Sequence, residues 1–375
     1  MNDVKKSEVG KHGQKREPLI HITKRVGVPL WKSIMIRAIA IGAALVVCGV
    51  LTMLFTGDNP LSIYASFFVG AFGDPQKIWF TMQNLVILLG IALAVTPAFK
   101  MKFWNTGAEG QVLAGGLATA MCMFWLGGKI PDWVLIIVML TAGVAAGMLW
   151  GILPAVFKAK WNTNETLFTL MMNYVAIQLI EWFVKIADKT GSNTVGPTVL
   201  KYGWIPDLFG QKYLFNIIVV AALTVVIYIY LKYSKHGYEI SVVGESEKTA
   251  RYIGINVPKV IIRTMALSGA ICGLMGFLLV GVTSHSISAD TAGGRGFTAI
   301  MVSWLAQFNP IFMVLTSLLL VFLGRGAEEV STKFDLNQSF SDIVTGIILF
   351  FIIGCEFFIR YKVNFRGHHE KKENN

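Results

Sequence analysis

The sequence predicts an all-α polytopic integral membrane protein with about eight to ten transmembrane helices, including one broken hairpin. Hydrophobic residues make up 54% of the 375 positions and charged residues only 15%, against about 25% in soluble proteins. Long apolar runs recur along almost the whole chain, and the net charge of +11 gathers in clusters between them. Such Lys and Arg clusters mark the cytoplasmic ends of spans and contact anionic lipid, so we predict no nucleic-acid partner.

Three regions follow from the distribution of charge. Residues 1–32 are predicted to be a basic cytoplasmic amino-terminal segment, residues 33–360 the transmembrane domain, and residues 361–375 a cytoplasmic tail. No small-residue cleavage site follows the first apolar run, so we expect this run to stay in the membrane as an anchor. The four cysteines lie singly in apolar segments and are interpreted as small hydrophobic residues.

The first five predicted spans are residues 34–55, 78–99, 103–121, 133–157 and 164–186. Each is close to the length that crosses about 30 Å of hydrocarbon, and pairs of lysines mark the inner ends of the second and fourth. The third contains glycines and alanines that would let a neighbouring helix approach closely. The segment at 56–76 carries two aspartates and is expected outside, with part of it along the membrane interface.

The remaining predicted spans are residues 213–231, 260–282 and 343–359. Residues 187–212 contain Gly, Pro and mixed charge, and are interpreted as the largest external loop. The Gly-rich stretch after the seventh span cannot lie in lipid. Residues 297–308 and 311–323 are each short for a span and meet at Asn309-Pro310, so they predict the broken hairpin, with residues 324–340 outside.

The polar stretch at 235–259 separates two apolar runs on the predicted cytoplasmic side. Ser246 can cap a short helix there, and Gly254 stands where a left-handed residue would end it. Glu247 and Arg251 suit the first and last turns of this helix. So short a helix is marginal in water by itself. We therefore expect it to lie against a partner, and a soluble protein rather than the rest of this chain.

Polar residues within the apolar segments are candidates for a transport path, each with a structural alternative. Glu109 and Asn164 open predicted spans, where each could instead stabilise the start of its helix. Asn173 lies within a span and could bind either a neighbouring helix or a hydroxylated solute. The predicted path residues are Asn105, Glu109, Gln111, Asn164, Asn173, Trp304 and Gln307.

The sequence carries no evident catalytic or metal motif. It lacks the phosphate-binding loop GxxxxGK[ST], the metalloprotease motif HExxH and the nucleophile motif GxSxG, and it has no mid-membrane pair of acids. We therefore predict no catalytic residue, no metal and no cofactor of its own. Transport would be passive or would use energy supplied by another protein.

Six motifs stand in order along the chain: WNTGAEGQ at 104–111, NETLFTLMMNY at 164–174, GESEKTARYIGINV at 244–257, GGRGFTAI at 293–300, NP at 309–310 and SDIVTGIIL at 341–349. Together they resemble the permease subunits of bacterial ABC importers for nucleosides and simple sugars, within the wider group of ribose and branched-chain amino-acid permeases. The resemblance covers about residues 60 to 360. Two places depart from the pattern: Thr106 replaces the usual Ile, and SWLAQF at 303–308 replaces a run of small residues.

The resemblance implies a division of labour between subunits. Residues 245–257 would be the coupling helix, docking on a separate ATP-binding subunit that uses ATP and Mg. A second permease subunit, homologous or identical, would share the pore, and an extracellular solute-binding lipoprotein would deliver the substrate. The residues assigned to coupling are Glu245, Glu247, Ala250, Arg251, Gly254 and Ile255.

The leading hypothesis is a multi-pass permease subunit of an ABC importer in the bacterial plasma membrane. It would move a nucleoside or related simple sugar inward by alternating access, and NETLFTLMMNY with the basic amino-terminal extension favours the nucleoside branch. The alternative is a self-contained secondary transporter or channel for a small neutral solute, which predicts ion-coordinating or protonatable groups at mid-membrane. An intramembrane enzyme would need paired catalytic groups in facing spans.

Overall fold

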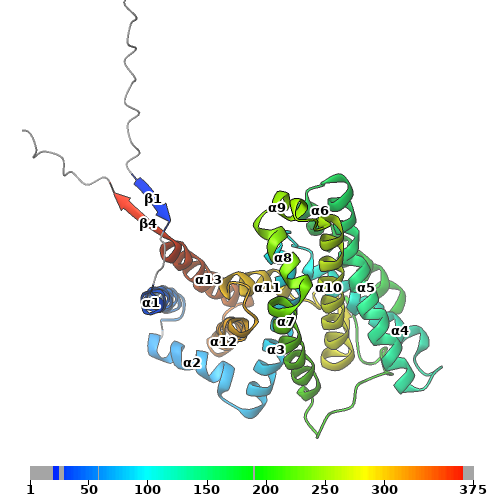
Figure 1. Cartoon of the computed structure of the whole chain (residues 1–375). Coiled ribbons are helices and arrows are strands. Elements are labelled where there is room, and N and C mark those ends of the chain that lie inside the picture. Colours follow the sequence, from blue (N-terminus) through cyan, green and yellow to red (C-terminus); the bar gives the residue numbers. More distant parts are fainter. Residues whose placement is uncertain (1–19, 25–28, 58, 189–190, 366–375) are drawn as a thin grey trace, which may run out of the picture. The chain divides into compact units, whose positions relative to one another are not determined.

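The computed structural model describes residues 20–24, 29–57, 59–188 and 191–365. The chain divides into unit 1, residues 1–57 with 346–375, and unit 2, residues 58–345. Figure 1 colours the elements in chain order. The helices are α1 (Leu30–Thr56), α2 (Pro60–Phe72), α3 (Pro75–Lys100), α4 (Ala108–Leu126), α5 (Asp132–Trp161), α6 (Glu165–Ala187), α7 (Leu214–Tyr233), α8 (Lys235–Glu245), α9 (Glu247–Tyr252), α10 (Val257–Leu278), the π-helix η1 (Leu279–Ser284), α11 (Arg295–Leu305), α12 (Pro310–Lys333) and α13 (Gln338–Arg360). The strands are β1 (Ile20–Lys24), β2 (Thr194–Val195), β3 (Ile287–Ser288) and β4 (Tyr361–Phe365).

Eight helical segments in the described part of the chain are long and apolar enough to cross a membrane. They lie in α1, α3, α5, α6, α7, α10 with η1, α12 and α13. The all-α polytopic class predicted from the sequence is therefore confirmed.

Unit 1 contains α1, the later part of α13 and a small antiparallel sheet. Strand β1 pairs with β4 in a register that runs from Ile20 opposite Phe365 to Lys24 opposite Tyr361. Arg37 of α1 forms a 2.7 Å ion pair with Glu356 of α13. Most of the predicted basic amino-terminal segment and of the predicted tail, at residues 1–19, 25–28 and 366–375, lies outside the described residues.

The centre of unit 2 is formed by α4, α5 and α10, which pack against one another (Figure 1). Glycines make this possible, because a Cβ at Gly147, Gly269 or Gly273 would overlap the backbone of the facing helix. A Cβ at Gly115 or Gly276 would collide in the same way between α4 and α10. Close contact of this kind replaces the hydrophobic effect as the main source of helix association in lipid.

One end of unit 2 is closed by η1 and by the loop between α6 and α7. Strand β2 of that loop pairs with β3, which follows η1. A buried network joins three elements next to it: Gln83 of α3 and Asn216 of α7 both donate to the Thr283 hydroxyl of η1, at 2.5 and 3.0 Å. The predicted external loop is therefore anchored on the π-helix.

Three boundaries differ from the sequence prediction. The segment predicted to start at residue 103 becomes helical only at Ala108, and residues 101–107 form a loop. The stretch at 235–259 contains a further helix, α8. Helix α12 was predicted to be short for a span, but it is 24 residues long. It continues through Arg325, Glu328 and Glu329, which were expected in an external loop. Those charges are paired: Glu329 binds Lys77 at 2.8 Å, and Arg325 binds Glu328.

Candidate functional site

The loop at 101–107 turns the chain back into the protein after α3. Asn105 within it is fully buried, and its Nδ2 donates to the Ser268 hydroxyl of α10 at 3.3 Å. Its Oδ1 accepts from the Gly107 N–H at 3.0 Å and from Gln111 Nε2 at 3.3 Å. Because buried backbone must find hydrogen-bond partners, Asn105 fixes the path of this loop.

Helix α6 holds the same loop from its other side. Asn173 Nδ2 donates to the Thr106 carbonyl at 2.9 Å, and Asn173 Oδ1 accepts from the Gly110 N–H at 2.8 Å. The Thr106 hydroxyl lies 3.0 Å from that of Thr169 and donates to the carbonyl of Thr166. Asn173 is 3% exposed, and its amide hydrogen-bonds the backbone of this chain; a place on a transport path stays a prediction.

Glu109, in the first turn of α4, caps a different helix, α11. Its two carboxylate oxygens accept from the N–H groups of Gly294 and Gly296 at 2.7 and 2.6 Å. The positive end of the α11 dipole is thereby neutralised from within the chain. Gly296 is required here, since a Cβ would overlap the Glu109 backbone.

Helix α11 has 11 residues, or about 16 Å, and so covers half of a membrane. Arg295 at its start donates to Asn84 Oδ1 at 3.0 Å. Asn84 stands in the tenth position of α3, about 14 Å from the start of that helix. The start of α11 therefore lies beside the middle part of α3, a helix of spanning length, and transporters often build substrate sites on such discontinuous helices.

An aromatic cluster lies where α11 ends. Trp304 of α11 stacks on Trp104 of the 101–107 loop, with ring centroids 5.5 Å apart. Phe99 of α3 contacts both indoles edge-on, and Phe308 contacts Trp304. Gln307, between Trp304 and Phe308, is exposed.

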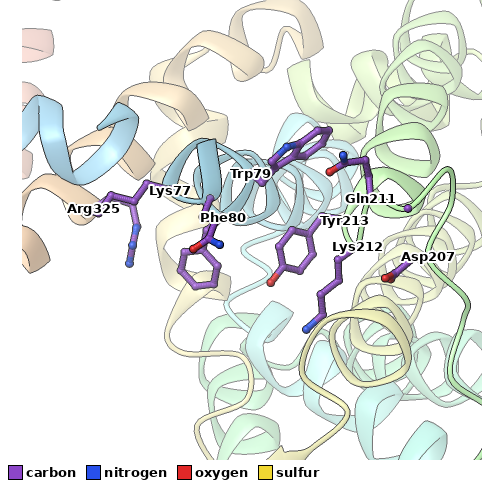
Figure 2. A pocket seen from close by; sticks show the side chains of 10 residues that line it. Lys77, Trp79, Phe80, Asp207, Gln211, Lys212, Tyr213 and Arg325 are labelled. Atoms are coloured by element: carbon purple, nitrogen blue, oxygen red, sulfur yellow. The ribbon is translucent and has the colours of Figure 1, made fainter. Parts of the chain in front are cut away.

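A cavity of about 560 Å³ opens at the end of unit 2 where α3 and α7 begin. Figure 2 shows Trp79, Gln211, Tyr213 and Lys212 between Arg325 with Lys77 on one side and Asp207 on the other. Its volume is in the range of small-molecule sites, which combine aromatic walls with a few polar groups.

A second cavity, of about 330 Å³, lies beside the first and next to the start of α11. The two cavities share Phe80 and Arg325, whose guanidinium carbon lies 4.6 Å from the Phe80 ring centroid. Asn84, Arg295 and Thr298 line the second cavity. Polar groups thus continue from the surface cavity to the capped end of the half-helix.

Helix α9 stands at the opposite ends of α3 and α7. Its predicted caps are confirmed: the Ser246 hydroxyl accepts from the Thr249 N–H at 3.2 Å, and Gly254 has φ +86°. Tyr252 is 92% exposed, whereas Ala250 is fully buried. The expectation that this helix lies against a separate protein instead of its own chain is wrong for the Ala250 face.

Ala250 belongs to a hydrophobic cluster that joins α9 to the 101–107 loop. Met101 and Phe103 of the loop and Val257 of α10 are members of the same cluster. Gly244 of α8 packs against the Lys100 carbonyl so closely that a Cβ would overlap it. Any displacement of α8 and α9 would therefore also displace the carboxyl-terminal end of α3 and the loop that follows.

The structure places the other predicted residues as follows. Asn164 is exposed and caps α6 by accepting from the Leu167 N–H at 3.1 Å. Glu245 ends α8, Ile255 is partly buried beside the Ala250 cluster, and Glu247 forms an exposed 3.8 Å ion pair with Arg251. A path or coupling role for these residues remains a prediction.

Sequence reasoning missed several residues that shape these sites. They are Trp79, Phe80, Phe99, Trp104, Thr169, Asn216, Ser268, Arg325 and Phe308. Only Trp104 carried a usable signal, because a large aromatic residue stands directly before the polar NTGAEGQ run.

Residues 77–353 match the family described as branched-chain amino acid transport system, permease component. The chain is 30% identical over 324 residues to the guanosine ABC transporter permease protein of Bacillus subtilis (strain 168), covering 84% of this chain and 91% of that one. It is 28% identical over 346 residues to a nucleoside ABC transporter permease protein of Lactococcus lactis subsp. cremoris (strain MG1363), covering 88% and 91%. It is 27% identical over 361 residues to a glucose ABC transporter permease protein of Haloferax volcanii, covering 92% and 93%.

The family match spans most of unit 2 and part of α13, including the polar loop, the half-helix and α9. Together with eight apolar helices of spanning length, it shows a multi-pass protein of the cell membrane. The chain belongs to the permease-component family of ABC transport systems named for branched-chain amino acids.

Proposed function

We propose that this chain is the membrane-spanning subunit of an importer that carries nucleosides into the cell, driven by a separate ATP-binding subunit. The observation that carries the proposal is α9, a capped two-turn helix with exposed Tyr252 and Ile253 on one face and buried Ala250 on the other. A helix with these two faces can bind a partner through its exposed residues and transmit the partner's movement to its own chain through Ala250.

The contacts of α9 supply a route for that push. Ala250 packs with Met101 and Phe103, and these flank a loop that Asn105 and Asn173 hold by hydrogen bonds. The loop leads directly into Glu109, which grips the start of α11. Closure of an ATP-binding partner on α9 would therefore shift the loop and the half-helix together, which is one way to alternate access.

The two connected cavities give the substrate a way in from the other end. Trp79 and Tyr213 offer aromatic surface to a base, and Gln211 and Lys212 offer hydrogen bonds to a sugar. Past Phe80 and Arg325, the second cavity reaches Asn84 and the start of α11.

The start of α11 offers no free site for the carboxylate of an amino acid. Substrate carboxylates bind transporters at the free N-termini of broken helices, but Glu109 already occupies that position on α11. Two of the relatives named above carry guanosine or nucleosides in their names, and one carries glucose. Glucose is therefore the second candidate.

The proposal includes three partners. The ATP-binding subunit, which uses ATP and Mg, docks on α9; a second permease subunit completes the pore; and a solute-binding lipoprotein delivers the nucleoside to the cavity of Figure 2. In this arrangement both termini and α9 face the cytoplasm, as the distribution of basic residues favours.

The test is uptake of radiolabelled guanosine, uridine, glucose and leucine by cells that express the chain with candidate ATP-binding and receptor partners. We expect nucleoside uptake that disappears when the partner ATPase is inactivated by a substitution in its phosphate-binding loop. Uptake of glucose or leucine alone would make that solute the cargo in place of nucleosides. Uptake that persists with the inactive ATPase would refute an ATP-driven importer.

A further inference from the structure

The aromatic cluster at the end of α11 has a geometry that core packing does not explain. The planes of Trp104 and Trp304 are inclined by 29°, a stacked arrangement, and Phe99 closes one side of the pair. Yet Trp104 is 46% exposed and Trp304 37% exposed. Within the described part of the chain, neither indole N–H has a hydrogen-bond partner, so both donors are available to a ligand.

The backbone after α11 adopts an unfavourable conformation that maintains this cluster. Gln307 and Phe308 are consecutive non-glycine residues with φ of 51° and 61°, a region that L-residues rarely occupy. The turn brings the Phe308 ring to 5.5 Å from Trp304. Such strain is typical of functional sites.

Both tryptophans also lie at the ends of their elements, beside Phe99 at the end of α3. Trp104 lies in the loop that returns toward α4, and Trp304 lies in the last turn of the half-helix α11. Met101 and Phe103, which precede Trp104 in the chain, share a cluster with Ala250 of α9. A movement of α9 would therefore change the separation of the two indoles.

We infer that Trp104 and Trp304 form a base-stacking station, in which a nucleobase inserts between the two indoles during transport. This inference rests on the proposed function and narrows its cargo to solutes with a flat aromatic ring. Insertion replaces one indole stack by two base stacks, and the free indole N–H groups can donate to base or ribose oxygens. An aliphatic sugar has no π-face and gains neither stack.

The experiment measures guanosine uptake by the assembled transporter, with adenosine and ribose as unlabelled competitors. The variants are Trp104→Leu, Trp304→Leu and Trp304→Phe. The control is Trp125→Leu, because Trp125 is 45% exposed and also contacts a phenylalanine, but lies at the end of α4 away from the station.

Base–aromatic stacking predicts that each Leu variant raises the inhibition constant of adenosine about tenfold. The constant for ribose should stay the same, Trp304→Phe should have a small effect, and Trp125→Leu none. Parallel changes for adenosine and ribose, no change for either, or ATP-independent leakage of both solutes would overturn the station.

A second measurement needs no variant and so does not depend on folding. Wild-type transporter is irradiated with 8-azidoadenosine, and the labelled peptides are identified by mass spectrometry. Labelling that includes Trp104 or Trp304 and is lost with excess adenosine supports the station, and specific labelling only elsewhere overturns it. If the wild type takes up no nucleoside, the proposed function fails. If it takes up nucleosides but neither the labelling nor the Leu variants implicate the two tryptophans, only the base-stacking station fails.

Discussion

His285 shows how a single side chain can anchor an entire loop. It follows η1 with φ 49°, and its ring stacks on Trp204 of the α6–α7 loop with centroids 4.2 Å apart. Burial lowers the pKa of His285 below its usual 6.5, and the positive charge of Lys212 lowers it further, while Asp207 opposes the shift. The stack therefore contains a neutral imidazole.

The lowered pKa of His285 predicts a loss of stability in mild acid. Below about pH 6.5 the unfolded chain binds a proton at this position before the folded chain does, so the free energy of unfolding falls with pH. We expect the melting temperature of the purified protein to fall between pH 7.5 and pH 5.5. His285→Phe keeps the ring stack and should make the profile flatter; an unchanged slope in this variant would contradict the role of His285.

Individual residues also show where sequence reasoning reaches its limit. Asn164 was correctly offered as a cap, because capping depends on neighbours three residues away. Asn173 could not be assigned from sequence, since its partners Thr106 and Gly110 are more than sixty positions distant. The carboxylate of Glu109 serves α11, 185 residues along the chain, although the sequence suggested its own helix.

Among the elements, α9 allows a sharp test of coupling. Gly254 donates its N–H to the Arg251 carbonyl at 3.1 Å and needs a positive φ, and proline can provide neither. Gly254→Pro should abolish co-purification of an ATP-binding subunit and ATP-dependent uptake, while membrane insertion stays normal. Gly254→Asn, which tolerates left-handed backbone, is the matched control and should retain both. Equal recovery of the ATPase with the proline variant would exclude α9 as the coupling element.

Elements were predicted well where local pattern decides and poorly where distant pairing decides. Apart from α12, the apolar runs located the long helices to within about five residues, and the glycines of α4 were recognised as contact positions. The end of α12 was misplaced because Glu328 and Glu329 suggest solvent. In the fold, Arg325 pairs with Glu328 and Lys77 pairs with Glu329. Because Lys77 and Glu329 are far apart in the chain, no local stretch of sequence reveals their pairing.

At the scale of the whole molecule, the pairing of β1 with β4 brings residues 20–24 and 361–365 together on one side of unit 1. The basic clusters favour the cytoplasm for that side and for α9, and the exterior for the α6–α7 loop. An epitope inserted after Ser192 should be accessible to antibody on intact cells, whereas one added after Asn375 should require permeabilisation. The reverse pattern would invert the topology and remove α9 from the reach of a cytoplasmic ATPase.

The hydrogen bonds of Glu109 to the start of α11 have a consequence for which solutes could leave a cell through such a protein. Phosphorylation traps nucleosides in the cytosol because the products are anions. An anion that left by this route would need a positively charged site to bind partway along it. The start of α11 would be that site, but the Glu109 carboxylate fills it, and its charge also acts on the neighbouring Arg295, whose guanidinium already donates to Asn84. An entry route for nucleosides would thus remain closed to the nucleotides made from them.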